Sequence, residues 1–347
     1  MIGKSSRLAP IVALAATSWV CAISYTAGTD SNGDITPPIV ASGAADPKFH
    51  HDAPTPEELD QLLKTGFAAT VRVDRVLVPA VVTDGRGKPV SGLTKSDFRL
   101  LEDAVPQKID YFDVSHGEQV SIVFLLDVSG SMRLLDKLGE AREAIRYFLG
   151  GLKDTDQVGM LTFADGEVDM VAPLGTRPDR LAAYLLAVKA YGQTALNDAI
   201  AAAPGIIGDG DSGRKAIVLI TDGIDNASKL SLTEATAVAR RTDVPIYTIG
   251  FSSSSLPARK KDPDAGTNAE VLKRISTETG GSFFWIEDPD ELKEAVVGIE
   301  DDLRTQYVLG YTPPVTRCDG TFRKIDLKVA KDRYRVRSRK GYMPGPC

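Results

Sequence analysis

The pattern of hydrophobic and polar residues changes twice along this chain. Between about residues 66 and 116, apolar and polar residues alternate over short stretches such as ATVRVDRVLVPAVV, which is typical of strands with one buried face. From 117 to 304, wholly apolar stretches alternate with amphipathic ones. From 305 to 347, short alternating stretches return, as in TFRKIDLKVA. The pattern therefore predicts an α/β domain flanked by two β segments.

Within residues 117–304, the apolar stretches have the length of buried strands, and helical spacing separates them. An apolar face is expected at Leu134, Leu138, Ala141, Ile145 and Phe148, and a further helix at Pro289–Arg304. The expected strands are Val120–Leu126, Val158–Phe163, Ala216–Thr221, Ile246–Phe251 and Ser282–Ile286, with Val168–Val171 as an antiparallel edge strand. Apolar strands alternating with helices predict a doubly wound, mostly parallel sheet covered on both faces.

The two β segments, 66–116 and 305–347, are each too small to bury a core alone. Because both adjoin the ends of the α/β domain, we expect them to pack into one small β domain, with residues 117–304 inserted into it. The last strand carries alternating Arg335, Arg337 and Arg339. Such a row is expected to be the solvated face of an edge strand, with contact to an acidic partner as the alternative.

The first 65 residues read as a targeting segment followed by a linker. Lys4 and Arg7 precede an apolar run from Leu8 to Ile23, which predicts a signal peptide or an uncleaved anchor at 1–27. Residues 28–65 are rich in Gly, Ala, Pro and Asp and are expected to form a disordered linker. We therefore expect an exported protein, which would be periplasmic, secreted or on the cell surface.

Charge and cysteine content narrow the function further. The net charge of −6 becomes −8 when the two basic residues of segment 1–27 are removed, and such an acidic protein is a poor nucleic-acid binder.

Cys318 and Cys347 are the cysteines that remain once segment 1–27 has been removed. They flank the same end of an expected hairpin, so we expect them to form a disulfide in an oxidising compartment. A free C-terminal thiol is the alternative.

Polar oxygens follow the expected strands at one edge of the sheet. The stretch SIVFLLDVSGSM runs directly into Asp127, Ser129 and Ser131, whose spacing of two points their side chains the same way. The strand AIVLIT ends before Asp222, and Thr194 lies on a Gly-containing turn that opens a helix. Ligands bind outside the carboxyl ends of strands in open α/β sheets, so these five residues are expected to converge.

Three hydroxyls and two carboxylates make a set of hard oxygen ligands. This set suits Mg²⁺, which we expect, or Mn²⁺ or Ca²⁺, rather than Zn²⁺. Taken singly, Thr194 or a serine after a strand would be an ordinary helix cap. The conjunction of three separate loops at one sheet edge favours a metal site. With two charged ligands, the bound ion would keep positive charge and accept another anionic oxygen.

The motifs DVSGSM, GQTAL and ITDG resemble the metal-ion-dependent adhesion site (MIDAS) of von Willebrand factor type A domains, over about residues 117–304. In that family, hydroxyls matching Ser129, Ser131 and Thr194 contact the metal, and carboxylates matching Asp127 and Asp222 act directly or through water. The flanking stretches VVTDGRG, GLTKSDF and YVLGY resemble the bacterial VWFA-related, acidobacterial-type proteins. The resemblance implies a protein ligand that offers an acidic residue to the metal.

Competing functions remain beside this binding module. A scaffold that assembles an envelope complex would use the same site. A metal-assisted hydrolase is less favoured, because the sequence supplies no clear second metal site or general base beside Thr194. A serine triad would need a histidine near Ser129 or Ser131, and His50, His51 and His116 all precede the first expected parallel strand. We therefore expect no enzyme activity.

The long connection after Phe251 should lie on the metal face of the domain. We expect its basic run, Arg259, Lys260 and Lys261, to determine ligand specificity, with a solvated, mobile insertion as the alternative.

Overall fold

A computed structural model of the protein describes residues 50–52, 75–114, 119–207, 214–223, 225–251, 265–313 and 320–344. Its strands are β1 (His50–Asp52), β2 (Val76–Thr83), β3 (Phe98–Glu102), β4 (Val105–Gln107), β5 (Tyr111–Val114), β6 (Ser121–Asp127), β7 (Gln157–Ala164), β8 (Glu167–Thr176), β9 (Lys215–Thr221), β10 (Ile246–Phe251), β11 (Phe283–Ile286), β12 (Tyr307–Tyr311), β13 (Arg323–Val329), β14 (Arg335–Ser338) and β15 (Gly341–Tyr342). The helices are α2 (Lys137–Gly151), α3 (Pro178–Ala187), α4 (Leu196–Ile207), α5 (Leu232–Ala239), α6 (Ala265–Thr279) and α7 (Pro289–Arg304), with short 3₁₀ turns at Lys95–Asp97 and Gly130–Asp136.

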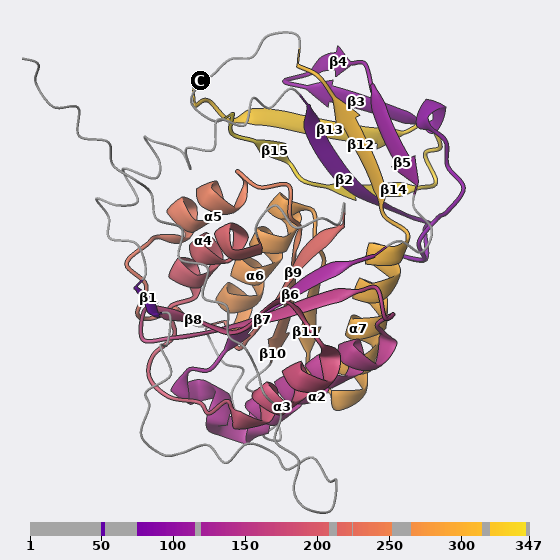
Figure 1. The fold of residues 1–347 in the computed structure, drawn as a ribbon. Helices are drawn as coiled ribbons and strands as arrows, with labels where there is room; N and C mark the ends of the chain where they lie inside the picture. Colours follow the sequence, from indigo (N-terminus) through magenta and orange to yellow (C-terminus); the bar gives the residue numbers. More distant parts are fainter. Residues whose placement is uncertain are drawn as a thin grey trace, which may run out of the picture. The chain divides into compact units, whose positions relative to one another are not determined.

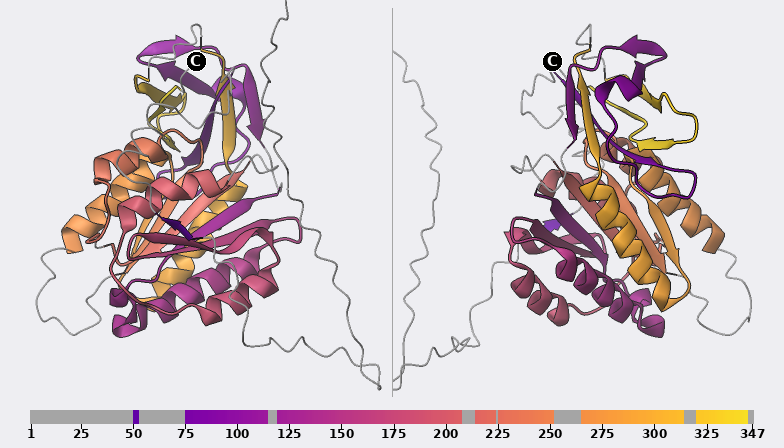
Figure 2. Two further views of the ribbon diagram at one scale, coloured as in Figure 1. Left: turned by 60° about the vertical axis from the view of Figure 1, so that its left-hand side comes forward. Right: turned by 90° about the vertical axis from the view of Figure 1, so that its right-hand side faces the viewer.

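The central sheet has β6 in its middle, and the strand order among the described residues is β1-β8-β7-β6-β9-β10-β11. Strands β7, β6, β9, β10 and β11 pair in parallel, whereas β8 runs antiparallel to β7. Helices α2, α3 and α7 cover one face, and α4, α5 and α6 cover the other (Figures 1 and 2). The predicted doubly wound, mostly parallel sheet is confirmed.

Strand β6 shows why an apolar run specifies this layer. Its alternate residues Ile122, Phe124 and Leu126 pack towards α2, α3 and α7, and Val123 and Leu125 pack towards α4, α5 and α6. Because both faces of the strand are covered, apolar side chains are favoured at every one of these positions, and the whole strand is buried.

The β segments on either side of the α/β domain fold together. Strand β12 lies between β2 and β5, and β13 pairs with β3, so strands from before and after the inserted domain share their sheets (Figure 1). The orders of these sheets in the described part are β14-β2-β12-β5 and β15-β13-β3-β4. Their inner faces enclose a core that includes Val78, Leu100, Tyr307 and Leu309. The predicted small β domain, built from both ends of the chain, is confirmed.

The β domain joins the α/β domain at the amino ends of the parallel strands. Chain entry is from β5 into the start of β6, and exit is from the end of α7 into β12. Buried Arg214, just before β9, donates from its guanidinium to the carbonyls of Leu303 and Gln306 at 3.0 and 2.9 Å. The carboxyl edge of the sheet, where the metal site was predicted, is therefore the edge away from this junction.

Several expectations need correction. Residues 50–52, placed in the linker, form β1 and pair antiparallel with Glu167–Asp169, so β8 is not the outermost strand there. The arginine row is a solvated face only in part: Arg335 is exposed on the edge strand β14, whereas Arg337 pairs with Asp302 of α7 and Arg339 is buried. These two side chains pack against the α/β domain instead.

Helix α2 begins later than the apolar spacing suggested. Leu134 belongs to the preceding 3₁₀ turn and is 62% exposed, so it is not part of the helix's buried face.

Some of the predictions concern residues outside the described part of the chain. These are segment 1–27, the basic run 259–261, Cys318 and Cys347.

Candidate metal centre

Asp127, the last residue of β6, is fully buried and anchors the first loop of the centre. Its Oδ1 accepts the Ser129 backbone N–H at 2.8 Å, and its Oδ2 accepts the Thr221 hydroxyl at 2.6 Å. The hydroxyl oxygens of Ser129 and Ser131 lie 3.0 Å apart. The two hydroxyls are thus neighbours, but the extended chain expected here ends at Ser129, and Ser131 is delivered by the 3₁₀ turn that begins at Gly130.

The second loop, which carries Thr194, is tied to the first by its backbone. The Gly130 N–H donates to the Gly192 carbonyl at 2.9 Å, and the Tyr191 N–H donates to the Val128 carbonyl at 2.7 Å. Gly192 has a φ of +67°, and a Cβ there would lie 2.1 Å from the Asp165 carboxylate. Glycine is thus required at this turn. Thr194, two residues later, is 2% exposed.

The third loop follows β9 and supplies Asp222. One carboxylate oxygen, Oδ1, accepts the Ser131 hydroxyl at 3.1 Å, which joins the first and third loops directly. The side-chain oxygen of Asn226 accepts the Thr194 N–H at 2.8 Å, and the Asn226 N–H returns a bond to the Thr194 carbonyl at 3.0 Å. The structure thus brings the loops of all five predicted ligands together at the carboxyl edge of the sheet.

Burial controls the electrostatics of Asp127. Loss of solvation raises the pKa of Asp127 from 3.8 to about 6; the hydrogen bond from Thr221 opposes this shift, and the negative charge of Asp222 adds to it. A buried carboxylate beside a second carboxylate is therefore costly to ionise. A cation placed among these oxygens would remove that cost.

The donor set fits a small divalent cation. Adjacent ligands of an octahedral ion with bonds of 2.0–2.1 Å lie about 3 Å apart. Two separations in the site have this size, 3.0 Å between the serine hydroxyls and 3.1 Å between Ser131 and Asp222. No group of three or more His, Cys, Asp or Glu side chains with metal-binding placement occurs in the described residues. A centre built from the five predicted ligands would therefore combine hydroxyl with carboxylate oxygens.

Sequence reasoning missed two residues that contact the predicted ligands. Thr221 donates to Asp127, and Lys137 forms an ion pair with Asp222, Nζ to Oδ2, at 2.9 Å. Lys137 gave no signal in the sequence, because the apolar spacing from Leu134 placed it inside the expected helix rather than at its first position. Thr221, as the last residue of an apolar strand, gave none.

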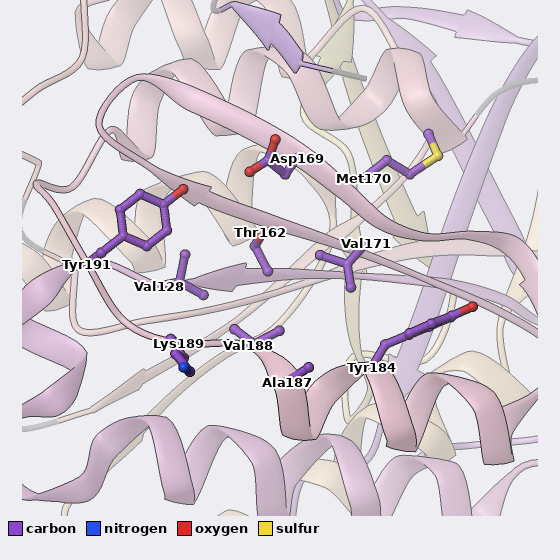
Figure 3. Close-up of a pocket in the computed structure, with 10 residues that line it drawn as sticks. All are labelled: Val128, Thr162, Asp169, Met170, Val171, Tyr184, Ala187, Val188, Lys189 and Tyr191. Carbon is purple, nitrogen blue, oxygen red and sulfur yellow. The ribbon is translucent and has the colours of Figure 1, made fainter. Parts of the chain in front are cut away.

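A cavity of about 370 Å³ lies beside these loops, between β8 and the segment that follows α3 (Figure 3). Its lining is mostly apolar or aromatic and consists of Val128, Thr162, Asp169, Met170, Val171, Tyr184, Ala187, Val188, Lys189 and Tyr191. Two lining residues belong to the loops of the metal centre, since Val128 lies between Asp127 and Ser129, and Tyr191 adjoins Gly192. The cavity is therefore lined in part by two of the loops that carry predicted metal ligands.

Comparison with known proteins agrees with this architecture. The family model described as von Willebrand factor type A domain matches residues 121–297. A UPF0353 protein of Mycolicibacterium gilvum is 26% identical over 208 residues, which are 54% of this chain and 62% of that protein. The chain thus aligns with less than two thirds of that relative's length.

Two solved structures are also similar. A von Willebrand factor type A protein from Catenulispora acidiphila has a TM-score of 0.45 and 14% identity, covering 77% of this chain and 71% of that one. Proximal thread matrix protein 1 from the mussel byssus, with a zinc-occupied MIDAS motif, has a TM-score of 0.45 and 18% identity, covering 58% and 50%. Among the residues described for the present chain, no helix is long and apolar enough to cross a membrane.

Proposed function

Because this chain belongs to the von Willebrand factor type A domain family, we propose that it is an exported, metal-dependent protein-binding module. The observation that carries the proposal is the cluster of hydroxyl and carboxylate oxygens at the carboxyl edge of the sheet, with Ser131 about 3 Å from both Ser129 and Asp222. A divalent cation held there supplies an open coordination position for an oxygen of a ligand carboxylate. Mg²⁺ is the ion we propose.

The protein's own residues prepare this site before any ligand arrives. Asp127 is fixed by hydrogen bonds from Ser129 and Thr221, so its carboxylate needs no reorganisation. Ser129, Ser131 and Thr194 add neutral oxygens, which satisfy coordination without cancelling the ion's charge. Two carboxylates offset the charge of a divalent ion, and the ammonium group of Lys137 beside Asp222 leaves a net positive charge that attracts an acidic side chain. Binding rather than catalysis is part of the proposal, because the side chains recorded in contact with Asp127 and Asp222 are hydroxyl and ammonium groups rather than histidines.

The ligand is proposed to be a protein segment with an acidic residue. Ser131 is only partly buried, whereas Asp127 and Asp222 are buried, so the ligand would approach from the side of the Ser131 loop. The neighbouring cavity, lined by residues such as Tyr184, Val188 and Tyr191, offers room for an apolar side chain close in sequence to the coordinating carboxylate. Aromatic lining of this kind is typical of protein-binding hot spots.

Calorimetry and affinity capture test the proposal. The purified protein is titrated with Mg²⁺ and Mn²⁺, and then used to capture partners from an envelope extract with Mg²⁺ or with EDTA. Asp127→Ala and Thr194→Ala should lose metal binding and Mg²⁺-dependent capture while keeping the fold. Asp154→Ala is the matched control, because Asp154 is exposed and precedes β7 at the opposite edge of the sheet. Unchanged metal affinity in Asp127→Ala would show that the site is wrongly assigned.

A further inference from the structure

A buried lysine reaches into the metal centre. Lys137 Nζ lies 2.9 Å from Asp222 Oδ2, and the two side chains are only 4% and 2% exposed. The other oxygen of the same carboxylate accepts the Ser131 hydroxyl. Asp222 is therefore shared between an internal ammonium group and the predicted ligand set.

The local backbone is strained where it delivers this lysine. Leu135 and Asp136 adopt left-handed conformations, with φ of 57° and 58°, immediately before α2. Residues other than glycine rarely adopt this conformation, because the Cβ crowds the neighbouring carbonyl. Lys137 then occupies the first position of α2, where the helix dipole opposes a positive charge. Strain, desolvation and the dipole all act against this arrangement, so the contact with Asp222 is what compensates for them.

Counted over its buried groups alone, the charges of the centre balance only with both an ion and an anionic ligand. Asp127 and Asp222 contribute −2 and Lys137 contributes +1, so a divalent cation brings the sum to +1. One carboxylate from a ligand then makes the site neutral. Without Lys137, the ion alone would neutralise the site and a ligand carboxylate would leave it at −1. Such differences are large in a site shielded from water.

We propose that Lys137 is a built-in cation that weakens metal binding alone and couples it to the binding of a carboxylate ligand. This inference rests on the proposed metal-dependent function and adds a regulatory property to it. Ion and ligand then bind cooperatively, and each raises the affinity of the other by the same factor. The site is occupied when both the ion and the carboxylate ligand are present. The charge of Lys137 does not raise the affinity for a neutral ligand.

The test measures Mn²⁺ affinity of the full chain at pH 7.5, with and without 100 mM acetate as a carboxylate probe and with chloride at equal ionic strength. Lys137→Met should bind Mn²⁺ at least tenfold tighter without acetate, and the gain in affinity produced by acetate in wild type should disappear. Lys137→Arg, which keeps the charge, should behave like wild type. Lys293→Met removes the same charge from an exposed position on α7 and should change nothing. Lys137→Gln keeps a donor for Asp222 without charge and gives the same readout if the Met variant does not fold.

Each outcome separates this inference from the proposed function. If wild type binds Mn²⁺ and the uncharged variants bind equally or more weakly, Lys137 merely positions Asp222 and the inference is overturned. If only the uncharged variants bind Mn²⁺, the inference is upheld while the wild-type metal-dependent function fails. If no variant binds, both fall.

Discussion

Replacing Asp127 with asparagine should have opposite effects on the metal-free and metal-bound protein. The substitution preserves shape and removes the charge of a fully buried group. In the wild type, burial raises the pKa of Asp127 from 3.8 to about 6. That difference corresponds to about 3 kcal/mol of folding free energy that the ionised side chain costs at neutral pH. Asparagine should recover part of it.

The size of the gain follows from the hydrogen bonds. The oxygen of the substituted amide can still accept the Ser129 N–H, but the amide NH₂ group would face the Thr221 hydroxyl, which in the wild type donates to Oδ2 of Asp127 at 2.6 Å. Thr221 must then turn its proton elsewhere, and one lost hydrogen bond costs about 1 kcal/mol. We expect Asp127→Asn to be more stable than wild type by about 1–2 kcal/mol in EDTA at pH 7.5. The melting temperature should rise by about 2–8 °C.

Saturating Mg²⁺ should reverse the order, because ligand binding stabilises the wild type alone. In EDTA the difference between the proteins should also depend on pH with a defined sign. Between pH 4 and 6, native Asp127 holds a proton that the unfolded chain has released, so wild-type stability rises as pH falls through this window. Thermal and urea unfolding would measure both effects. An Asp127→Asn protein less stable than wild type in EDTA at pH 7.5 would refute the reasoning.

Further predictions concern the rest of the molecule. Mn²⁺ affinity should fall about tenfold per pH unit below about pH 6, as protons compete for Asp127, which titration calorimetry would show. Arg337→Met leaves Asp302 buried without its ion pair and should cost about 2–3 kcal/mol in urea unfolding, with Mn²⁺ affinity unchanged. Cys318 and Cys347 should pair, adding about 3–4 kcal/mol; two free thiols in unreduced protein would exclude this. Partner association should become slower and lose salt dependence when alanines replace Arg259, Lys260 and Lys261.

Strand ends made the placement of the candidate metal ligands predictable from sequence. An apolar run that stops at a carboxylate fixes where β6 ends, and parallel pairing brings the end of β9 to the same edge. The positions of Asp127, Ser129, Ser131 and Asp222 follow from these two facts. The insertion of one domain into another was also predictable, because neither β segment has enough apolar residues for its own core.

Lys137 was not predictable, because its place depends on a backbone conformation that the local sequence disfavours. The apolar spacing from Leu134 to Leu138 indicates a helix through this stretch, yet Leu135 and Asp136 are left-handed and α2 begins at residue 137. Tertiary contacts, which include the ion pair with Asp222 and the burial of Met132, stabilise that conformation. Arg337 was misjudged for a similar reason, since its partner Asp302 is distant in sequence, on α7. Ion pairs between residues that are distant in sequence leave no periodic pattern from which they could be predicted.

Ion pairs that hold a buried carboxylate occur at both edges of the α/β domain, although Arg337 is 30% exposed whereas Lys137 is 4% exposed. At the amino edge, Arg337 meets Asp302 and fixes the β domain against α7. At the carboxyl edge, Lys137 meets Asp222 and fixes the orientation of a predicted metal ligand. A buried pair contributes little net stability compared with apolar packing, but it permits few alternative arrangements. The ion pair at the junction edge therefore restricts how the two domains pack, and the pair at the other edge holds Asp222 in one orientation in the proposed metal site.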